Sequence, residues 1–201
     1  MILLCSNAQH IYWLGRYLMR VNFFCSRVPF TQDQDAIEFS HAFCLPAYDA
    51  ASLNELALDP EQPYSFAKQF SYARDNIYEL RSVLAAKAYS ELNVLIKNAS
   101  EQPGYICDIV QECNEILEAE TDRDILLFFS LGQKIELLDS VLRFKQDPTA
   151  AMAQLDGIIH ALRNYGWVSL EDAWLQFKLE PNLISFYHFH DQLQLMFEAP
   201  V

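Results

Sequence analysis

The sequence predicts an all-α fold, a single-domain helical bundle of about seven helices. Apolar residues recur at spacings of three and four along most of the chain, and no segment shows the period-two alternation of a strand. Glycine is rare, with 5 in 201 residues, and the prolines fall between the periodic segments. Because no Pro-, Gly- or Ser-rich linker divides the chain, we expect one domain over residues 1–201.

The first helix is predicted over residues 7–28, with Asn7 as its N-cap. One apolar seam runs along it to Pro29, and its members are Ile11, Leu14, Leu18, Val21, Cys25 and Val28. A second helix is expected over about residues 34–44, before Pro46, and a weaker one over residues 52–58. Residues 64–98 contain no proline or glycine and predict one long helix that could bend near residues 85–88.

The later helices are bounded by capping signals. Pro103 and Gly104 precede a helix over residues 105–119. Thr121 with Asp124 resembles a capping box that opens a helix over residues 125–145. The boundaries of the remaining three helices are set by Asp147 before Pro148, Gly166, Ser169 with Asp172, and Asn182.

Composition excludes several classes of function. The chain carries 14 basic and 27 acidic residues, a net charge of −13, which argues against binding nucleic acid or an anionic lipid surface. No apolar run approaches the ~20 residues that span a bilayer, and the start, MILLCSN, lacks the basic region of a signal peptide. We therefore expect a cytoplasmic protein that does not bind membranes. Five scattered cysteines without a CxxC pair predict reduced thiols and no zinc ribbon or disulfide framework.

No cofactor or metal site is predicted, and no catalytic residue is assigned. Glu38 and His41 form an E-x-x-H pair, but di-metal helical bundles need a second such pair, which this sequence lacks. His188 and His190 lie two residues apart and do not face each other on a helix. The chain has no nucleophile motif and no glycine-rich loop for phosphates.

Three arginines, Arg16, Arg20 and Arg27, share the face of the first helix opposite its apolar seam. Spacing alone favours a solvated face that forms ion pairs. The alternative is an anion or carboxylate site, because guanidinium groups bind carboxylates in a bidentate fork and stack on aromatic rings such as Trp13 and Phe23.

The segment IYWLGRYLMRVN, residues 11–22, resembles the opening signature of the Alpha-E domain family, Y-W-x-G-R-Y-x-E-R-A-E. The matching residues are Tyr12, Trp13, Gly15, Arg16, Tyr17 and Arg20. Met19 replaces the signature glutamate, and Asn22 replaces a second acidic residue. A central segment, residues 71–93, is similar to the family's R-E-N-A-R-x-V-R helix, with matches at Arg74, Asn76, Arg81, Leu92 and Asn93.

An internal repeat is also predicted, between Trp13–Asn22 and Ser130–Asp139, at an offset of 117 residues. The pattern alone is weak, because any two amphipathic helices share it. Alpha-E proteins, however, repeat the motif L-G-R-Y-x-E-R-A-D late in the chain. Gly132, Glu136 and Asp139 match that motif, whereas Gln133 and Leu137 replace both of its arginines.

Each copy of the motif is therefore half complete. The first keeps Arg20 and the second keeps Glu136. We predict that the two helices lie together about a pseudo-twofold axis and that this pair shares one polar site. The resemblance adds to this site Arg16, Arg74, Arg81, Tyr17 and Asn76. The alternative is that the motif has decayed because the site is no longer used.

The resemblance implies a context more than a reaction. Alpha-E proteins are commonly encoded with, or fused to, circularly permuted ATP-grasp proteins and transglutaminase-like proteins. The expected function is a non-catalytic accessory or substrate-docking role in peptide synthesis or protein modification, with such a protein as partner. One alternative is an acid–base or metal-dependent enzyme that uses Glu136 or Glu38. Another is a structural dimerisation module, a homo-oligomer built on Trp13, Tyr17 and Phe23.

Overall fold

The computed structural model describes residues 3–101 and 105–198, and these form ten α-helices and no strand. The all-α prediction is confirmed, whereas the expected number of about seven helices was too low. The helices are α1 (Cys5–Cys25), α2 (Asp33–Phe43), α3 (Ala50–Leu58), α4 (Phe66–Glu79), α5 (Ala86–Glu101), α6 (Ile106–Glu118), α7 (Arg123–Arg143), α8 (Thr149–Leu162), α9 (Val168–Leu179) and α10 (Leu183–Glu198).

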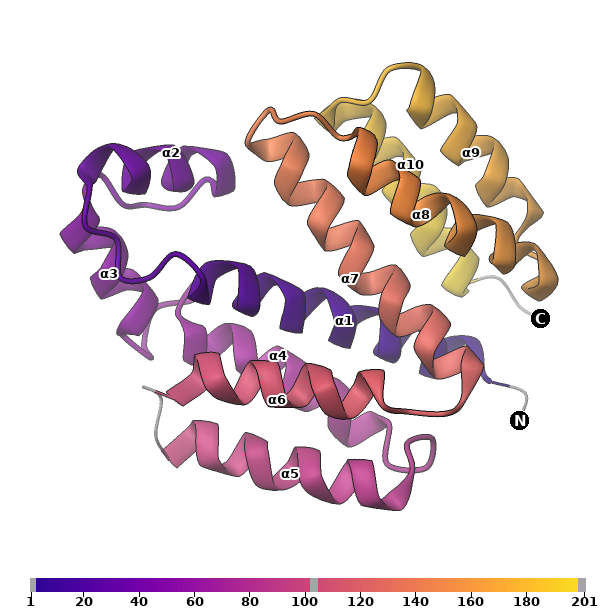
Figure 1. Cartoon of the computed structure of the whole chain (residues 1–201), viewed down its shortest axis with the longest axis horizontal. Coiled ribbons are helices and arrows are strands. Elements are labelled where there is room, and N and C mark those ends of the chain that lie inside the picture. The colour runs from indigo at the N-terminus through magenta and orange to yellow at the C-terminus, as the bar shows by residue number, and fades with distance from the viewer. Residues whose placement is uncertain (1–2, 102–104, 199–201) are drawn as a thin grey trace.

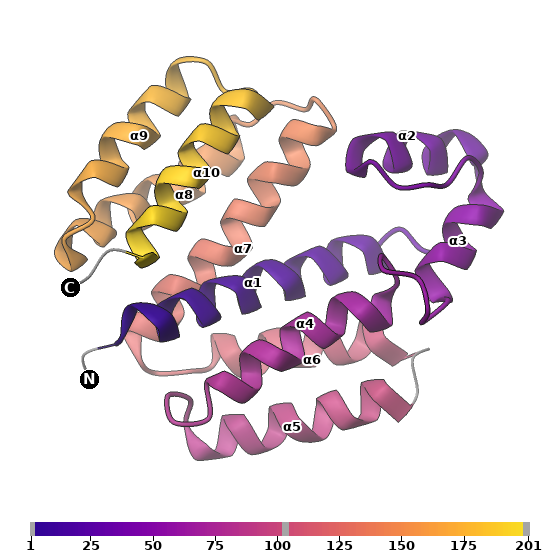
Figure 2. The ribbon, with the colours of Figure 1, turned by 180° about the vertical axis from the view of Figure 1, so that it is seen from behind.

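Two long helices, α1 and α7, cross near the middle of the molecule and organise the others around them (Figure 1). Helices α4, α5 and α6 pack together on one side of α1, and α8, α9 and α10 gather along α7 (Figures 1 and 2). The short helices α2 and α3 lie beyond the C-terminal end of α1. The crossing therefore places the motif of the first helix against the late part of the chain.

The crossing depends on two glycines, Gly15 in α1 and Gly132 in α7. A Cβ atom added to Gly15 would clash with the Phe129 carbonyl oxygen and would lie 3.3 Å from the Gly132 Cα atom. A Cβ atom added to Gly132 would clash with the Tyr12 carbonyl oxygen. Only glycine leaves room for the two backbones to approach this closely.

The long helix expected over residues 64–98 is broken into α4 and α5. The turn between them carries Leu80, Val83 and Leu84, which are all buried, and the Leu80 carbonyl accepts hydrogen bonds from both Val83 and Leu84. These side chains keep helical spacing although the backbone turns, so the apolar pattern could not reveal the break. The predicted boundary at Pro103 and Gly104 lies outside the described residues.

Capping signals gave mixed results. Asn182 caps α10 as predicted, and its side-chain oxygen accepts from the Ile184 and Ser185 backbone N–H groups. Gly166 ends its segment in the left-handed region, with φ of 83°. Asp122, and not Thr121, caps α7, because its carboxylate accepts from two backbone N–H groups of the first turn.

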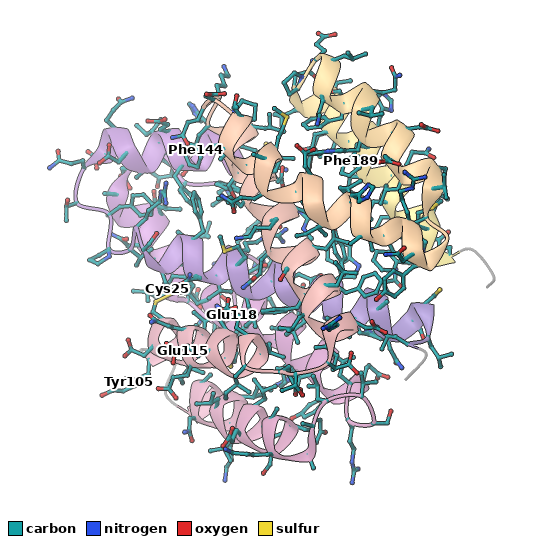
Figure 3. All side chains as sticks on the ribbon, turned by 45° about the vertical axis from the view of Figure 1, so that its right-hand side comes forward. Cys25, Tyr105, Glu115, Glu118, Phe144 and Phe189 are labelled. Carbon is teal, nitrogen blue, oxygen red and sulfur yellow. A yellow bond between two sulfur atoms is a disulfide. The ribbon has the colours of Figure 1, made fainter. Side chains whose placement is uncertain are left out.

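The prediction that all cysteines are reduced was wrong. Cys25 and Cys107 form a disulfide between the end of α1 and the first turn of α6 (Figure 3), with Cα atoms 5.4 Å apart. The two residues lie 82 positions apart in sequence, so spacing gave no sign of the pair. Cys5, Cys44 and Cys113 are free. Among the described helices, none combines the length and the hydropathy that crossing a bilayer requires.

Candidate functional site

The Arg16 side chain lies in the protein interior at the α1–α7 crossing. Only 4% of the residue is exposed. Its Nε donates to Glu136 at 2.7 Å, its Nη2 to Asp139 at 3.3 Å, and its Nη1 to His190 Nε2 at 2.7 Å. The favoured sequence interpretation, a solvated basic face, is therefore wrong for this residue.

Arg20 and Glu136 form the predicted contact. Arg20 Nε donates to Glu136 Oε1 at 2.6 Å, and Arg20 Nη2 donates to Glu136 Oε2 at 2.9 Å. This is the bidentate fork that guanidinium and carboxylate groups favour. The Arg20 side chain stays 34% exposed, whereas the Glu136 side chain is only 1% exposed, so Arg20 connects the interior to the surface.

A third guanidinium, that of Arg143, completes what we call the polar cluster. Its Nε donates to Asp139 at 2.9 Å, its Nη1 to the Ala42 carbonyl at 3.1 Å, and its Nη2 to the Tyr187 hydroxyl at 2.8 Å. The cluster consists of Arg16, Arg20, Glu136, Asp139 and Arg143. Three guanidiniums against two carboxylates leave one positive charge in excess.

Helical spacing and the glycine crossing together build this cluster. Arg16 and Arg20 are one turn apart on α1, and Glu136, Asp139 and Arg143 follow at steps of three and four on α7. Each set therefore lies on one face of its helix. Because the glycines bring the two backbones together, long arginine side chains from α1 reach the carboxylates of α7.

The charges of the cluster are set by mutual contact. Burial raises the pKa of Glu136, but the neighbouring Arg16 and Arg20 outweigh it and hold the pKa below its ordinary value. For Asp139 burial prevails over Arg143, and the pKa is raised. Although burial alone would lower the pKa of Arg16, the surrounding oxygens raise it. Arg16 and Glu136 are therefore a fixed ion pair at neutral pH.

His190 of α10 closes the cluster from the C-terminal part of the chain. Burial, together with the Arg16 charge, lowers its pKa to about 4. A guanidinium can only donate, so His190 Nε2 accepts from Arg16 and the ring is neutral. The Tyr12 hydroxyl lies 3.0 Å from the same nitrogen, and burial raises the pKa of Tyr12 to about 12, so it too is neutral.

A cavity of about 240 Å³ opens beside the cluster. Arg20, Arg143, Glu136 and Asp139 line its polar side. Its apolar side is formed mainly by phenylalanine rings from α1, α2 and α4, which include Phe24, Phe39 and Phe66. An anion with an apolar body matches this division of the walls.

Of two further predicted site residues, Tyr17 packs beside the cluster, whereas Asn76 is not part of it and its placement there was wrong. Tyr17 stacks on Trp13 with ring centroids 5.7 Å apart, and the Arg20 Cζ atom lies 5.7 Å from the Tyr17 ring centroid. Asn76 contacts the other end of α1, where its Oδ1 lies 3.0 Å from His10 Nδ1.

The other two predicted arginines are not part of the cluster, and their placement there was wrong. Within the part of the chain that the structure describes, Arg74 pairs only with its neighbour Asp75, and both side chains are at least 36% exposed. Arg81 is exposed in the turn after α4. Arg27, in the stripe of the first helix, lies over the Phe23 ring at 3.8 Å and does not reach the carboxylates.

Sequence reasoning missed three members of this site. Asp139 matches the family motif, but its spacing from Glu136 and Arg143 on one helix face is what marks it as a site residue. Arg143 could have been found by extending that face one turn. His190 lies 174 residues from Arg16 and carries no local signal.

The metal interpretation finds no support in the part of the chain that the structure describes. Within residues 3–101 and 105–198, no three His, Cys, Asp or Glu residues lie where they could hold a metal ion. Glu38 and His41 are exposed on α2.

Comparison with known proteins agrees with the fold and the motif. No curated protein and no solved structure matches the chain. One family model does match, over residues 3–171, and it describes a predicted alpha-helical domain with a conserved ER motif. Since that match covers most of the 201 residues and includes both α1 and α7, this chain belongs to the Alpha-E family.

Proposed function

We propose that this chain is a non-catalytic accessory protein that docks a substrate or a partner by binding its carboxylate. The observation that carries the proposal is the cavity of about 240 Å³ beside the polar cluster. Arg20 and Arg143 line it, and the cluster has one more guanidinium than carboxylate groups. A second anion would balance that charge through charge-assisted hydrogen bonds.

The proposed partners follow from the family context. Alpha-E proteins are commonly encoded with circularly permuted ATP-grasp and transglutaminase-like proteins, and the sequence here has no glycine-rich phosphate loop. We assign any ATP chemistry to such a partner. This chain would then present a peptide, or a peptide segment of the partner, to that chemistry.

Glu136 supports docking over acid–base catalysis. Its carboxylate is 1% exposed and accepts three hydrogen bonds from Arg16 and Arg20, which lower its pKa. A general acid at neutral pH needs a raised pKa and access to substrate. Glu136 has neither property, so we assign it the role of holding the arginines.

We further propose that the site joins the halves of a decayed repeat. The predicted offset of 117 residues pairs Gly15 with Gly132, and the two glycines do meet at the helix crossing. In this proposal Arg20 survives from one copy of the glutamate–arginine pair and Glu136 from the other. The single bidentate contact between Arg20 and Glu136 then replaces two symmetry-related glutamate–arginine contacts, one from each copy of the motif.

The expected cytoplasmic location is also kept as a proposal, and the Cys25–Cys107 pair offers a test. Disulfides are rare in the reducing cytoplasm. Alkylation of the thiols in intact cells before lysis would report their state. An intact disulfide in every molecule would count against the cytoplasm.

The docking role is tested with the ATP-grasp protein encoded nearest to this chain. We expect the two to form a complex by size exclusion, and we expect peptide modification by the pair to fall at least tenfold when Arg20→Met and Arg143→Met are combined. Arg74→Met is the matched control. Failure to form a complex, together with a stoichiometric transition metal in the purified chain, would overturn the proposal.

A further inference from the structure

We infer that the cavity binds the C-terminal residue of a peptide, with an apolar side chain, a free carboxylate and an acylated nitrogen. This inference rests on the proposed carboxylate-docking role and specifies its ligand. Three separate features of the cavity each select one of these chemical groups.

The carboxylate is selected by Arg20. Its Nε and Nη2 both donate hydrogen bonds to Glu136, while its Nη1 makes no hydrogen bond to any residue that the structure describes. The side chain is 34% exposed and lines the cavity. With the cluster one positive charge in excess, Nη1 is placed to donate to an incoming carboxylate.

The apolar side chain of the ligand is selected by the phenylalanine rings that form one wall of the cavity. Phe39 stands in its centre, with ring centroids 4.9 Å from Phe24 and 4.7 Å from Phe43. Phe144, at the end of α7, packs on the same group and lies beside α2 (Figure 3). An aromatic or aliphatic group against these rings would be removed from water, which favours binding.

The acylated nitrogen is selected by Gln69 of α4. Gln69 lines the same cavity, and its Oε1 atom is buried and has no hydrogen-bond partner among the described residues. A buried carbonyl without a donor is costly, and native proteins rarely leave one. Neither a carboxylate nor an aromatic ring can donate to it. An amide N–H beside the carboxylate can.

The same features argue against neighbouring ligand classes. A fatty acid has a carboxylate and an apolar body but no donor for Gln69. A free amino acid has a donor, but its ammonium group would add a positive charge to a cluster that already has one in excess. An acylated nitrogen donates without carrying charge.

The size of the cavity limits the ligand to about one residue. At about 240 Å³ it falls below the ~300–1,000 Å³ typical of sites for drug-sized ligands. Tyr64, which also lines the cavity, is 41% exposed. The cavity therefore opens to solvent, and the rest of a peptide can leave through that opening.

Calorimetric titration of the whole chain with N-acetylphenylalanine tests the inference. We expect saturable binding at least tenfold tighter than for 3-phenylpropionate, N-acetylphenylalaninamide, N-acetylglycine or free phenylalanine. These probes lack, in turn, the N–H group, the carboxylate, the ring and the acyl group. Absence of binding by N-acetylphenylalanine at millimolar concentration would overturn the inference.

Two variants assign the contacts, with folding checked by circular dichroism. Gln69→Leu should weaken N-acetylphenylalanine at least tenfold and leave 3-phenylpropionate unchanged. Arg20→Met should weaken both acids, whereas Arg74→Met, the same change at an exposed site, should weaken neither. If Gln69→Leu fails to fold, the affinities of N-acetylphenylalanine and 3-phenylpropionate for the wild-type chain still decide the role of the N–H group.

The possible failures point to different claims. If 3-phenylpropionate binds as tightly as N-acetylphenylalanine, the peptide inference is wrong and carboxylate docking stands. If N-acetylphenylalaninamide binds equally well, carboxylate recognition fails, and the proposed function loses the observation that carries it.

Discussion

Two pairs of arginines in this molecule were predicted to share one site, but only one pair contacts buried carboxylates. Arg16 and Arg20 on α1 bind buried carboxylates of α7, and Arg16 is only 4% exposed. Arg81 is exposed in the turn after α4. The Arg74 side chain, 36% exposed against 34% for Arg20, pairs with Asp75, whose side chain is 62% exposed. A motif match identified all four, but only the facing helix decides which of them meet a buried carboxylate.

The difference lies in what each helix contacts. Helix α1 packs against α4, α6, α7 and α10, so even its polar face is covered, and α7 supplies Glu136 and Asp139 there. On α4 the buried side chains are Phe66, Phe70, Ala73 and Ile77, and Arg74 lies beside that stripe. A buried arginine in this fold needs a carboxylate from another helix.

The largest expected effect is at Arg16. Arg16→Met removes one guanidinium from the interior and leaves the carboxylates of α7 only partly compensated. Breaking a buried ion pair from one side typically costs ~3–5 kcal/mol, and we expect the free energy of unfolding in urea to fall by that amount. A loss below ~1 kcal/mol would erase the contrast with the exposed arginines.

The next effect tests why α1 comes so close to α7. Gly132→Ala would force a Cβ atom against the Tyr12 carbonyl oxygen, and overpacking of this kind costs ~1–3 kcal/mol. Urea denaturation should show a loss near ~2–3 kcal/mol. Gly157→Ala on α8 is the control, because nothing lies within 4 Å of its added Cβ, and it should stabilise by ~0.5–1 kcal/mol.

A smaller effect belongs to His190, which donates no charge to the cluster but contacts Arg16. The pKa of His190 in the fold is about 4, below its ordinary value near 6.5, so the unfolded chain binds more protons between these pH values. Stability should therefore fall as pH drops from ~6.5 toward ~4, by on the order of 2 kcal/mol from this group.

Other groups of the cluster titrate at the acid end of that window. Because the pKa of Glu136 is lowered in the fold, its protonation adds to the loss of stability as pH falls. Because the pKa of Asp139 is raised in the fold, its protonation reduces that loss. His190→Gln should flatten the upper part of the profile, measured by urea unfolding at several pH values.

The smallest effects belong to the exposed arginines. Arg74→Met and Arg81→Met should each change the free energy of unfolding by less than ~0.5 kcal/mol, because surface ion pairs contribute little. Thermal and urea unfolding of both variants checks this. A loss above ~1 kcal/mol at either position would show that α4 carries a polar contact comparable to that of α1.

The fold class was predictable because helical periodicity is local, and most helix ends followed from prolines, Gly166 and Asn182. The Arg20–Glu136 contact was predictable because the first copy of the family motif retains only the arginine of the pair and the second copy retains only the glutamate. The break after Glu79 was not, since Leu80 and Leu84 keep the helical pattern through a turn.

Contacts across the whole chain were beyond sequence reasoning. The Cys25–Cys107 disulfide and the His190–Arg16 hydrogen bond join residues 82 and 174 positions apart. The positions of Cys25 and His190 in the sequence do not indicate which residue each of them contacts. The misplacement of Arg74 has the same origin, because a motif does not say which face of its helix is covered.

The separation of Arg16 from Glu136 by 120 residues sets an order of events during protein synthesis. At ~5–20 residues per second, α1 leaves the ribosome ~6–24 s before α7 is available to pair with it. During that interval α4 and α6 can cover part of the apolar seam of α1, but its two arginines lack their carboxylates. The nascent chain therefore depends on α7 to complete the burial of its first helix, and truncation before α7 should leave α1 as a substrate for chaperones.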